Sequence, residues 1–182
     1  MRIRALSTVL VAGILATTPQ VLAAGAAAEA SSAVVAPGTF STAHRVVHRS
    51  PDPAPLVTQI RVGHHATFDR IVIQLKGSHA PGFDVRYVTQ LRADPSDKVV
   101  NLLGPVSLAF VLSPANGHDP KTGHSTLTTP ARTKWGLDQV RETAVIGDFE
   151  AVFTLGVGLH RKAPFRVLTL HNPTRIVVDV RH

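Results

Sequence analysis

Hydrophobic and polar residues alternate with a period of two from about residue 56 to the end of the sequence. Alternation of this kind is typical of β-strands that bury one face. In the run LVTQIRV it predicts that Leu56, Ile60 and Val62 face the core. The same pattern recurs in the runs DRIVIQL, FDVRYV, VSLAFVL, AVFTLGVGL, FRVLTL and RIVVDV.

Glycine and proline residues separate these runs, with Pro81-Gly82 and Gly104-Pro105 at two of the breaks. Many short strands joined by turns favour an all-β sandwich or barrel. We therefore predict that residues 56–182 form an all-β sandwich of two small, mostly antiparallel sheets.

Two stretches of this predicted domain resemble each other, residues 57–88 and residues 140–170. Each contains a strand, a glycine, a phenylalanine followed by an acid, a second strand and a Phe-x-Val strand. The two Phe-acid pairs are Phe68-Asp69 and Phe149-Glu150. Our hypothesis is that the two units face each other as the two sheets of a pseudo-symmetric sandwich.

Residues 113–140 form the one long stretch without alternation and contain few apolar residues. Loops of this length inside a domain are often functional. We expect Trp135, near its end, to seat a short helical turn. The loop also contains His118, Asp119 and His124, which are residue types that bind transition metals. Their spacing fixes no geometry, so a solvated loop is the simpler interpretation.

The N-terminal segment has the features of a secretory signal peptide over residues 1–23. Arg2 and Arg4 precede an apolar stretch that is shorter than a transmembrane helix requires, and small residues lead to a cleavage point after Ala23. Residues 24–55 are rich in Ala, Ser and Pro and predict a flexible tether. We expect a secreted or cell-wall-associated domain. The alternative is an uncleaved signal that acts as a membrane anchor.

The chain is basic, with a formal net charge of +7. Without residues 1–23 the charge is +5, because this segment contains Arg2 and Arg4 and no acid. A basic exported domain is attracted to anionic polymers such as cell-wall material. We expect a cell-wall polymer (peptidoglycan) or an envelope protein as the partner, and no nucleic acid. The absence of cysteine excludes disulfides and thiolate metal sites.

Catalytic motifs are absent: the sequence contains neither HExxH nor G-x-S-x-G, and its carboxylates are scattered. We therefore expect no enzyme activity, no cofactor and no metal site. Ligand binding would then depend on exposed basic and aromatic residues, and the candidates are Arg61, Arg86, Trp135 and Arg161. For Trp135 the alternative is packing at one end of the sandwich.

The closing segment NPTRIVVDV places one acid, Asp179, in a strand of Ile and Val. Alternation puts Asp179 on the face opposite Ile176, Val178 and Val180. A buried carboxylate needs a partner. Arg70 or Arg166 on a neighbouring strand would lie within reach, because opposed Cβ atoms are about 5 Å apart. We predict a structural role for all three residues, and that Asp179→Ala destabilises the fold by roughly 1–3 kcal/mol.

Four segments carry a resemblance to a known family: DRIVIQL, FEAVFTLGVGL, PFRVLTL and NPTRIVVDV. Over residues 56–182 the chain resembles the AMIN-like domain of exported actinobacterial proteins, which is related to the AMIN domain of cell-wall amidases and secretins. The resemblance implies a β-sandwich and a non-catalytic role at the cell envelope, with peptidoglycan as the expected ligand. It implies no set of binding residues. In contrast to the amidases, we expect no catalytic domain after the sandwich, and we expect the domain to act by itself, through its tether or with a separate protein.

Three functions are therefore under consideration. The first is an exported, non-catalytic module that binds a cell-wall polymer. The second is a protein-interaction module that pairs a sheet edge with a strand of an envelope partner. The third and least favoured is a hydrolase built on the loop of residues 113–140.

Overall fold

The computed structural model describes residues 38–182, and this part contains twelve β-strands and no helix. None of the described residues therefore forms a helix that could cross a membrane. The strands are β1 (Arg45–Val47), β2 (Leu56–His65), β3 (Phe68–Lys76), β4 (Gly82–Val88), β5 (Leu91–Arg92), β6 (Val99–Val100), β7 (Val106–Ser113), β8 (Arg132–Lys134), β9 (Val140–Phe149), β10 (Val152–Leu159), β11 (Phe165–Leu170) and β12 (Arg175–Arg181).

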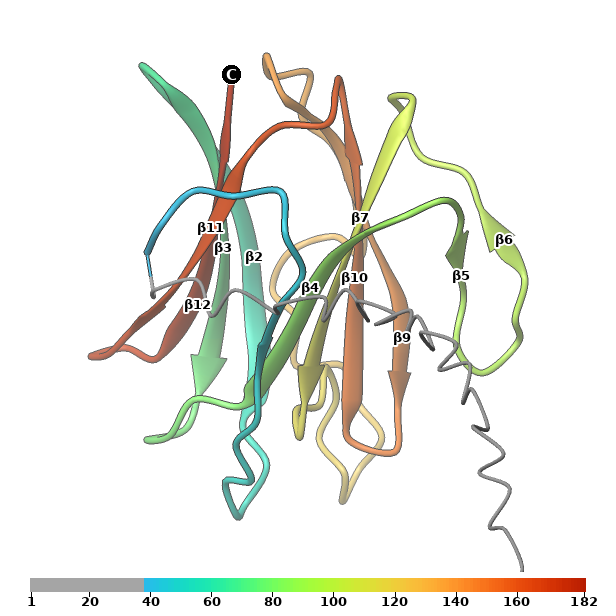
Figure 1. The fold of residues 1–182 in the computed structure, drawn as a ribbon. Coiled ribbons are helices and arrows are strands. Elements are labelled where there is room, and N and C mark those ends of the chain that lie inside the picture. Colours follow the sequence, from blue (N-terminus) through green and yellow to red (C-terminus); the bar gives the residue numbers. More distant parts are fainter. Residues whose placement is uncertain (1–37) are drawn as a thin grey trace, which may run out of the picture. The chain divides into compact units, whose positions relative to one another are not determined.

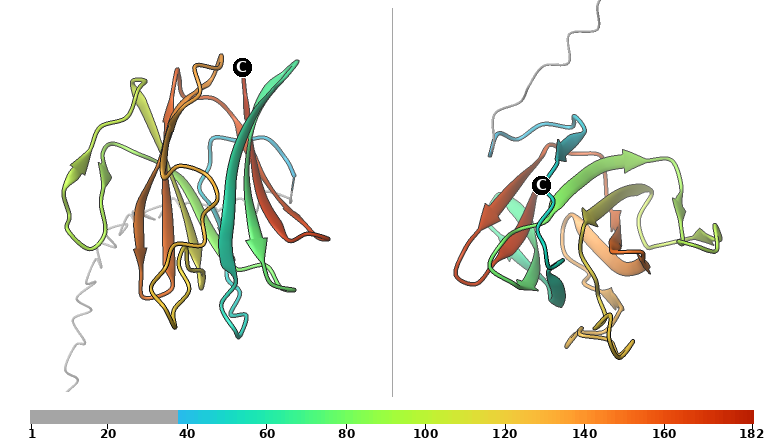
Figure 2. Two further views of the ribbon diagram at one scale, coloured as in Figure 1. Left: turned by 180° about the vertical axis from the view of Figure 1, so that it is seen from behind. Right: turned by 90° about the horizontal axis from the view of Figure 1, so that it is seen from below.

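The strands form two packed sheets, which confirms the predicted all-β sandwich. The four-stranded sheet has the order β11-β12-β3-β2, and the six-stranded sheet has the order β1-β4-β7-β10-β9-β8. Every pairing between the described strands is antiparallel. A two-stranded ribbon of β5 and β6 lies outside the six-stranded sheet (Figures 1 and 2).

The core lies between the two sheets and is built by the alternation that the sequence shows. In β3, Ile71, Ile73 and Leu75 are buried, as predicted. In β2, the run LVTQIRV differs from the prediction, because Val57 is fully buried and Leu56 is only partly buried. The pairing of β2 with β3 has a register shift between Val57 and Gln59, and this bulge moves the inward position by one residue.

The two similar stretches take corresponding places in the fold, although not as one sheet each. Each begins with a hairpin in one sheet, β2-β3 or β9-β10, and then sends its third strand, β4 or β11, to the other sheet. The hypothesis that each unit forms its own sheet is therefore wrong. The Phe-acid pairs also differ, because Phe68 opens β3 whereas Phe149 closes β9.

Part of the predicted tether, residues 38–55, is folded onto the domain. β1 pairs with β4, and Ser41 exchanges two backbone hydrogen bonds of 2.9 Å with Phe165 at the edge of β11. The prediction of a flexible tether is wrong for these residues, because the edge strands of the sandwich give this short polar segment hydrogen-bond partners. The predicted signal peptide at 1–23 and the first part of the tether lie outside the described residues.

The long loop of residues 113–140 contains the short strand β8 and is bonded to β2. Its residues Asn116 and Thr128 bond the backbone of β2 at Val57 N and Thr58 O, with distances of 2.7 and 2.8 Å. The loop therefore covers the outer edge of the four-stranded sheet. The helical turn expected at Trp135 is absent, because the chain there extends from β8, which pairs with β9. Trp135 packs against the core.

Candidate functional site

A buried acid lies on the outer face of the four-stranded sheet, near one end of its strands. Asp179 of β12 is fully buried, and the strand register places Arg70 of β3 and Arg166 of β11 directly opposite it on its two sides. Arg70 donates to both carboxylate oxygens, with distances of 2.6 Å to Oδ1 and 2.9 Å to Oδ2. Arg166 Nε donates to Oδ2 at 2.8 Å. Both arginines named as candidates from the sequence therefore contact Asp179.

The charge state of this acid follows from two opposing effects. Burial raises the pKa of Asp179, but the hydrogen bonds and charges of Arg70 and Arg166 lower it more, so that the pKa lies below its usual range. Asp179 is therefore ionised at neutral pH, and it holds the two guanidinium groups in fixed positions.

Aromatic rings lie against these arginines. The Arg166 guanidinium lies 4.6 Å from the ring centre of Phe40 and 5.5 Å from that of Phe68, and Arg181 lies 4.5 Å from Phe40. Arg70 lies 5.3 Å from Phe68. We call these five residues the Arg-Phe cluster. A surface hollow beside the cluster is lined by Phe40, Ala66, Thr67, Phe68, Arg166, Arg181 and His182.

A second buried acid, Asp69, lies near the same end of β3 but points inward. It shares the face of Ile71 and is fully buried. Its Oδ2 accepts hydrogen bonds from the backbone N–H groups of Gln139 and Val140, at 2.8 and 2.9 Å. These two amides come from the start of β9 in the other sheet, so the carboxylate joins the two sheets at this end.

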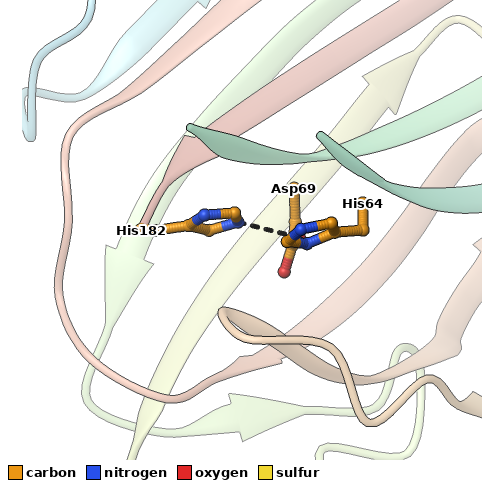
Figure 3. Close-up of side chains that lie close together, drawn as sticks. All are labelled: His64, Asp69 and His182. Atoms are coloured by element: carbon orange, nitrogen blue, oxygen red, sulfur yellow. Dashed lines mark hydrogen bonds and ion pairs between the residues drawn. The ribbon is translucent and has the colours of Figure 1, made fainter. Parts of the chain in front are cut away.

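Two histidines contact the other oxygen of Asp69 (Figure 3). His64 Nδ1 lies 3.1 Å and His182 Nε2 lies 3.0 Å from Oδ1. The two imidazole rings are nearly parallel, with centres 4.9 Å apart. We call this group the His-Asp-His cluster. Among residues 38–182 it is the only group of three metal-ligating side chains whose ligand atoms all lie within 4.8 Å of one another.

The pKa of Asp69 is also lowered. Burial raises it, but the hydrogen bonds from Val140, His182, Gln139 and His64 together outweigh burial. In the described part of the chain no arginine or lysine forms an ion pair with this carboxylate.

The four ligand-binding candidates from the sequence do not come together. Arg61 on β2 and Arg86 on β4 lie on the outer faces of different sheets. Trp135 follows β8 and donates from Nε1 to Thr143 Oγ1 at 2.9 Å, as its packing role predicts. Arg161 is exposed between β10 and β11. Because Arg61 and Arg86 lie on the outer faces of different sheets, the four residues do not share one binding face.

The metal ligands considered in the long loop also do not converge. His118 Nδ1 lies 2.7 Å from Asp148 Oδ2, whereas Asp119 and His124 are joined through a backbone hydrogen bond of 2.8 Å. Among the described residues, these loop side chains therefore form separate polar contacts and no shared metal site.

Sequence reasoning missed both clusters in part. The signal for Asp69 was present, since an acid stands at the inward position of the alternation that buries Ile71 and Ile73. Nothing in the sequence connects Asp69 with His182, because His182 lies beyond the alternating run that forms β12. Phe40 was missed because it lies in a segment without alternation.

The comparisons with known proteins give one match. The family model described as "AMIN-like domain" matches residues 55–182, which contain β2 to β12. No curated protein and no solved structure matches the chain. The matched region contains every residue of both clusters except Phe40.

Proposed function

Since the chain belongs to the AMIN-like domain family, we propose that it is an exported, non-catalytic module that binds a cell-wall polymer, with peptidoglycan as the expected ligand. Membership of this family is consistent with a cell-wall binding module and with a place outside the cytoplasm. The observation that carries the proposal is the Arg-Phe cluster with its surface hollow.

The chemistry of the hollow suits an anionic glycan. Guanidinium groups bind carboxylates and phosphates through two parallel hydrogen bonds, and aromatic rings stack on sugar faces. Arg166 is held in place by Asp179, so less side-chain entropy is lost when a ligand binds. Arg181 is exposed, lies against Phe40 and forms no ion pair within residues 38–182, which leaves its charge available to a ligand.

The outer face of the six-stranded sheet is less suited to binding a polymer. On the six-stranded sheet, Leu91 of the β5-β6 ribbon packs against Ala109, Ala144 and Ile146 and buries them. This apolar contact covers part of the surface that a polymer would otherwise reach. The outer face of the four-stranded sheet is therefore the better binding surface.

The alternative, pairing of a sheet edge with a partner strand, has less support. The edge of β2 is covered by the long loop, and β11 is bonded to Ser41. The two remaining edge strands of the large sheets, β1 and β8, have three residues each, and β8 carries Arg132 and Lys134. Short and positively charged edges discourage strand addition.

The test is a binding assay of the purified protein with peptidoglycan at low salt. We expect Arg181→Ala to weaken binding about fivefold or more, the effect of losing an anchoring arginine. The matched control is Arg61→Ala, because Arg61 is also an exposed arginine on the outer face of the four-stranded sheet and its removal changes the net charge equally.

Two results would contradict this proposal. Absence of binding at low salt, where electrostatic attraction is strongest, would exclude peptidoglycan as the ligand. Equal losses in Arg181→Ala and Arg61→Ala would show that net charge, and not the Arg-Phe cluster, attracts the polymer.

A further inference from the structure

We propose that His64, Asp69 and His182 form a binding site for a divalent transition metal ion of the zinc type. The site is distinct from the Arg-Phe cluster, and the inference does not depend on the proposed function. Three observations carry it: the spacing of the ligand atoms, the anchoring of the carboxylate and, within residues 38–182, the absence of an arginine or lysine paired with it.

The spacing of the ligand atoms fits a small cation. Zinc binds histidine nitrogen and carboxylate oxygen at about 2.0–2.2 Å, so neighbouring ligand atoms in a tetrahedral site lie roughly 3.3 Å apart. The distances from Asp69 Oδ1 to the two histidine nitrogens are 3.1 and 3.0 Å. The three ligand atoms lie within 4.8 Å of one another, so the two histidine nitrogens must move closer together to bind one ion.

The carboxylate is fixed in the orientation that a metal ligand needs. The backbone N–H groups of Gln139 and Val140 hold Oδ2, which leaves Oδ1 for the histidines. Hydrogen bonds of this kind orient ligands in metal sites and raise metal affinity. The imidazole rings are stacked nearly parallel, so they must turn to aim both lone pairs at one ion. His64 is free to do so, since its side chain is 49% exposed.

The charge of Asp69 is compensated differently from that of Asp179. Asp179 has two arginines, which are always protonated. Among the described residues, the partners of Asp69 are only two histidine side chains and two backbone amides. A divalent ion would replace the two hydrogen bonds to Oδ1 and neutralise a fully buried carboxylate.

The ligand types indicate which ions would bind. Two imidazoles and one carboxylate suit Zn²⁺, Ni²⁺, Co²⁺ or Cu²⁺, whereas Ca²⁺ and Mg²⁺ prefer oxygen ligands alone. Three protein ligands leave a fourth position open for water or for a ligand group. His182 also lines the hollow beside the Arg-Phe cluster, so a metal ion would lie next to the proposed polymer site.

The experiment is a calorimetric titration of the untagged, chelator-treated protein with ZnCl₂, followed by Co²⁺ absorption spectroscopy. We expect one equivalent to bind with the highest affinity, and a tetrahedral Co²⁺ spectrum. His64→Ala and His182→Ala should each weaken this binding at least tenfold. The matched controls are His65→Ala, an exposed histidine next to His64, and His124→Ala in the long loop; both should bind like the wild type.

These variants keep the test independent of folding. The side chains of His64 and His182 are 49% and 21% exposed, so their removal leaves the core intact, and a circular dichroism spectrum verifies this. Unchanged affinity in both variants, or no binding of Zn²⁺ or Co²⁺ by the wild type, would overturn the proposal. So would a loss confined to His124→Ala, which would place the ion in the loop.

Discussion

Two fully buried acids lie near the same end of the four-stranded sheet, and their surroundings differ. Asp179 pairs across the register with Arg70, and Asp69 of the next strand lies opposite Val180. Asp179 points to the outer face, where two arginines hold it. Asp69 points into the sandwich, where it contacts two histidines and two backbone amides. Two equally buried acids therefore have different chemical surroundings, because their partners differ.

The two networks differ in whether another cation can replace the partners of the acid. A guanidinium is always charged, so the Asp179 network is a fixed part of the sheet. Imidazoles can be neutral, protonated or metal-bound, so the Asp69 network can accept other cations without rearrangement of the strands. This is why we assign a structural role to Asp179 and a metal-binding role to Asp69.

The largest loss of stability is expected when Asp179, whose two arginine partners are always charged, is replaced. Asp179→Asn should lower the free energy of unfolding by about 3 kcal/mol, because Arg70 and Arg166 lose the charge that compensates them. This is the upper end of the range predicted for Asp179→Ala from the sequence. Urea unfolding in the presence of a chelator measures it. A loss below about 1 kcal/mol would show that the arginines find other partners or water.

Replacement of Asp69 by asparagine should lower the free energy of unfolding by a smaller amount. Asp69→Asn should destabilise the protein by about 1.5 kcal/mol, because the amide oxygen can still accept from Gln139 and Val140 and only the charge is lost. The measurement is again urea unfolding in chelator. A loss equal to or larger than that of Asp179→Asn would contradict the distinction between the two networks.

The contribution of Asp179 to the stability of the protein should depend on pH. The pKa of Asp179 in the folded protein lies below the unfolded value. Its contribution to stability is therefore fully present above about pH 5 and is lost as the pH falls through the lowered pKa. The stability difference between wild type and Asp179→Asn should accordingly narrow on acidification. Unfolding curves between pH 7 and pH 3 test this, and a difference independent of pH would contradict it.

The smallest change in the free energy of unfolding is expected for the replacement of His64, which is exposed. His64→Ala should change the free energy of unfolding by no more than about 0.5 kcal/mol in chelator, as is usual for surface positions. The same variant should lose the stabilisation that Zn²⁺ gives to the wild type, since an ion that binds only the folded state stabilises it. Thermal unfolding with and without ZnCl₂ measures both. Equal zinc stabilisation in the two proteins would contradict the metal site.

The sequence by itself determined the strands and one of the two acid networks. Alternation is a local property of the chain, so it reveals which residues of a strand face the core, as in Ile71 and Ile73. The same alternation marked Asp179 as a buried acid and pointed to Arg70 and Arg166, because directly opposed residues are close in any antiparallel sheet. It failed at Leu56, where a bulge shifts the pattern by one residue.

Only the tertiary structure decided where segments without a pattern lie and which strand ends meet. Phe40 reaches the arginines because its segment bonds to the edge of β11. Arg61 and Arg86 are separated because their strands belong to different sheets. His64, Asp69 and His182 meet because β2, β3 and β12 are neighbours whose ends coincide, and Asp69 is fixed by amides of the opposite sheet. Such contacts depend on the register and packing of distant strands, which no local pattern encodes.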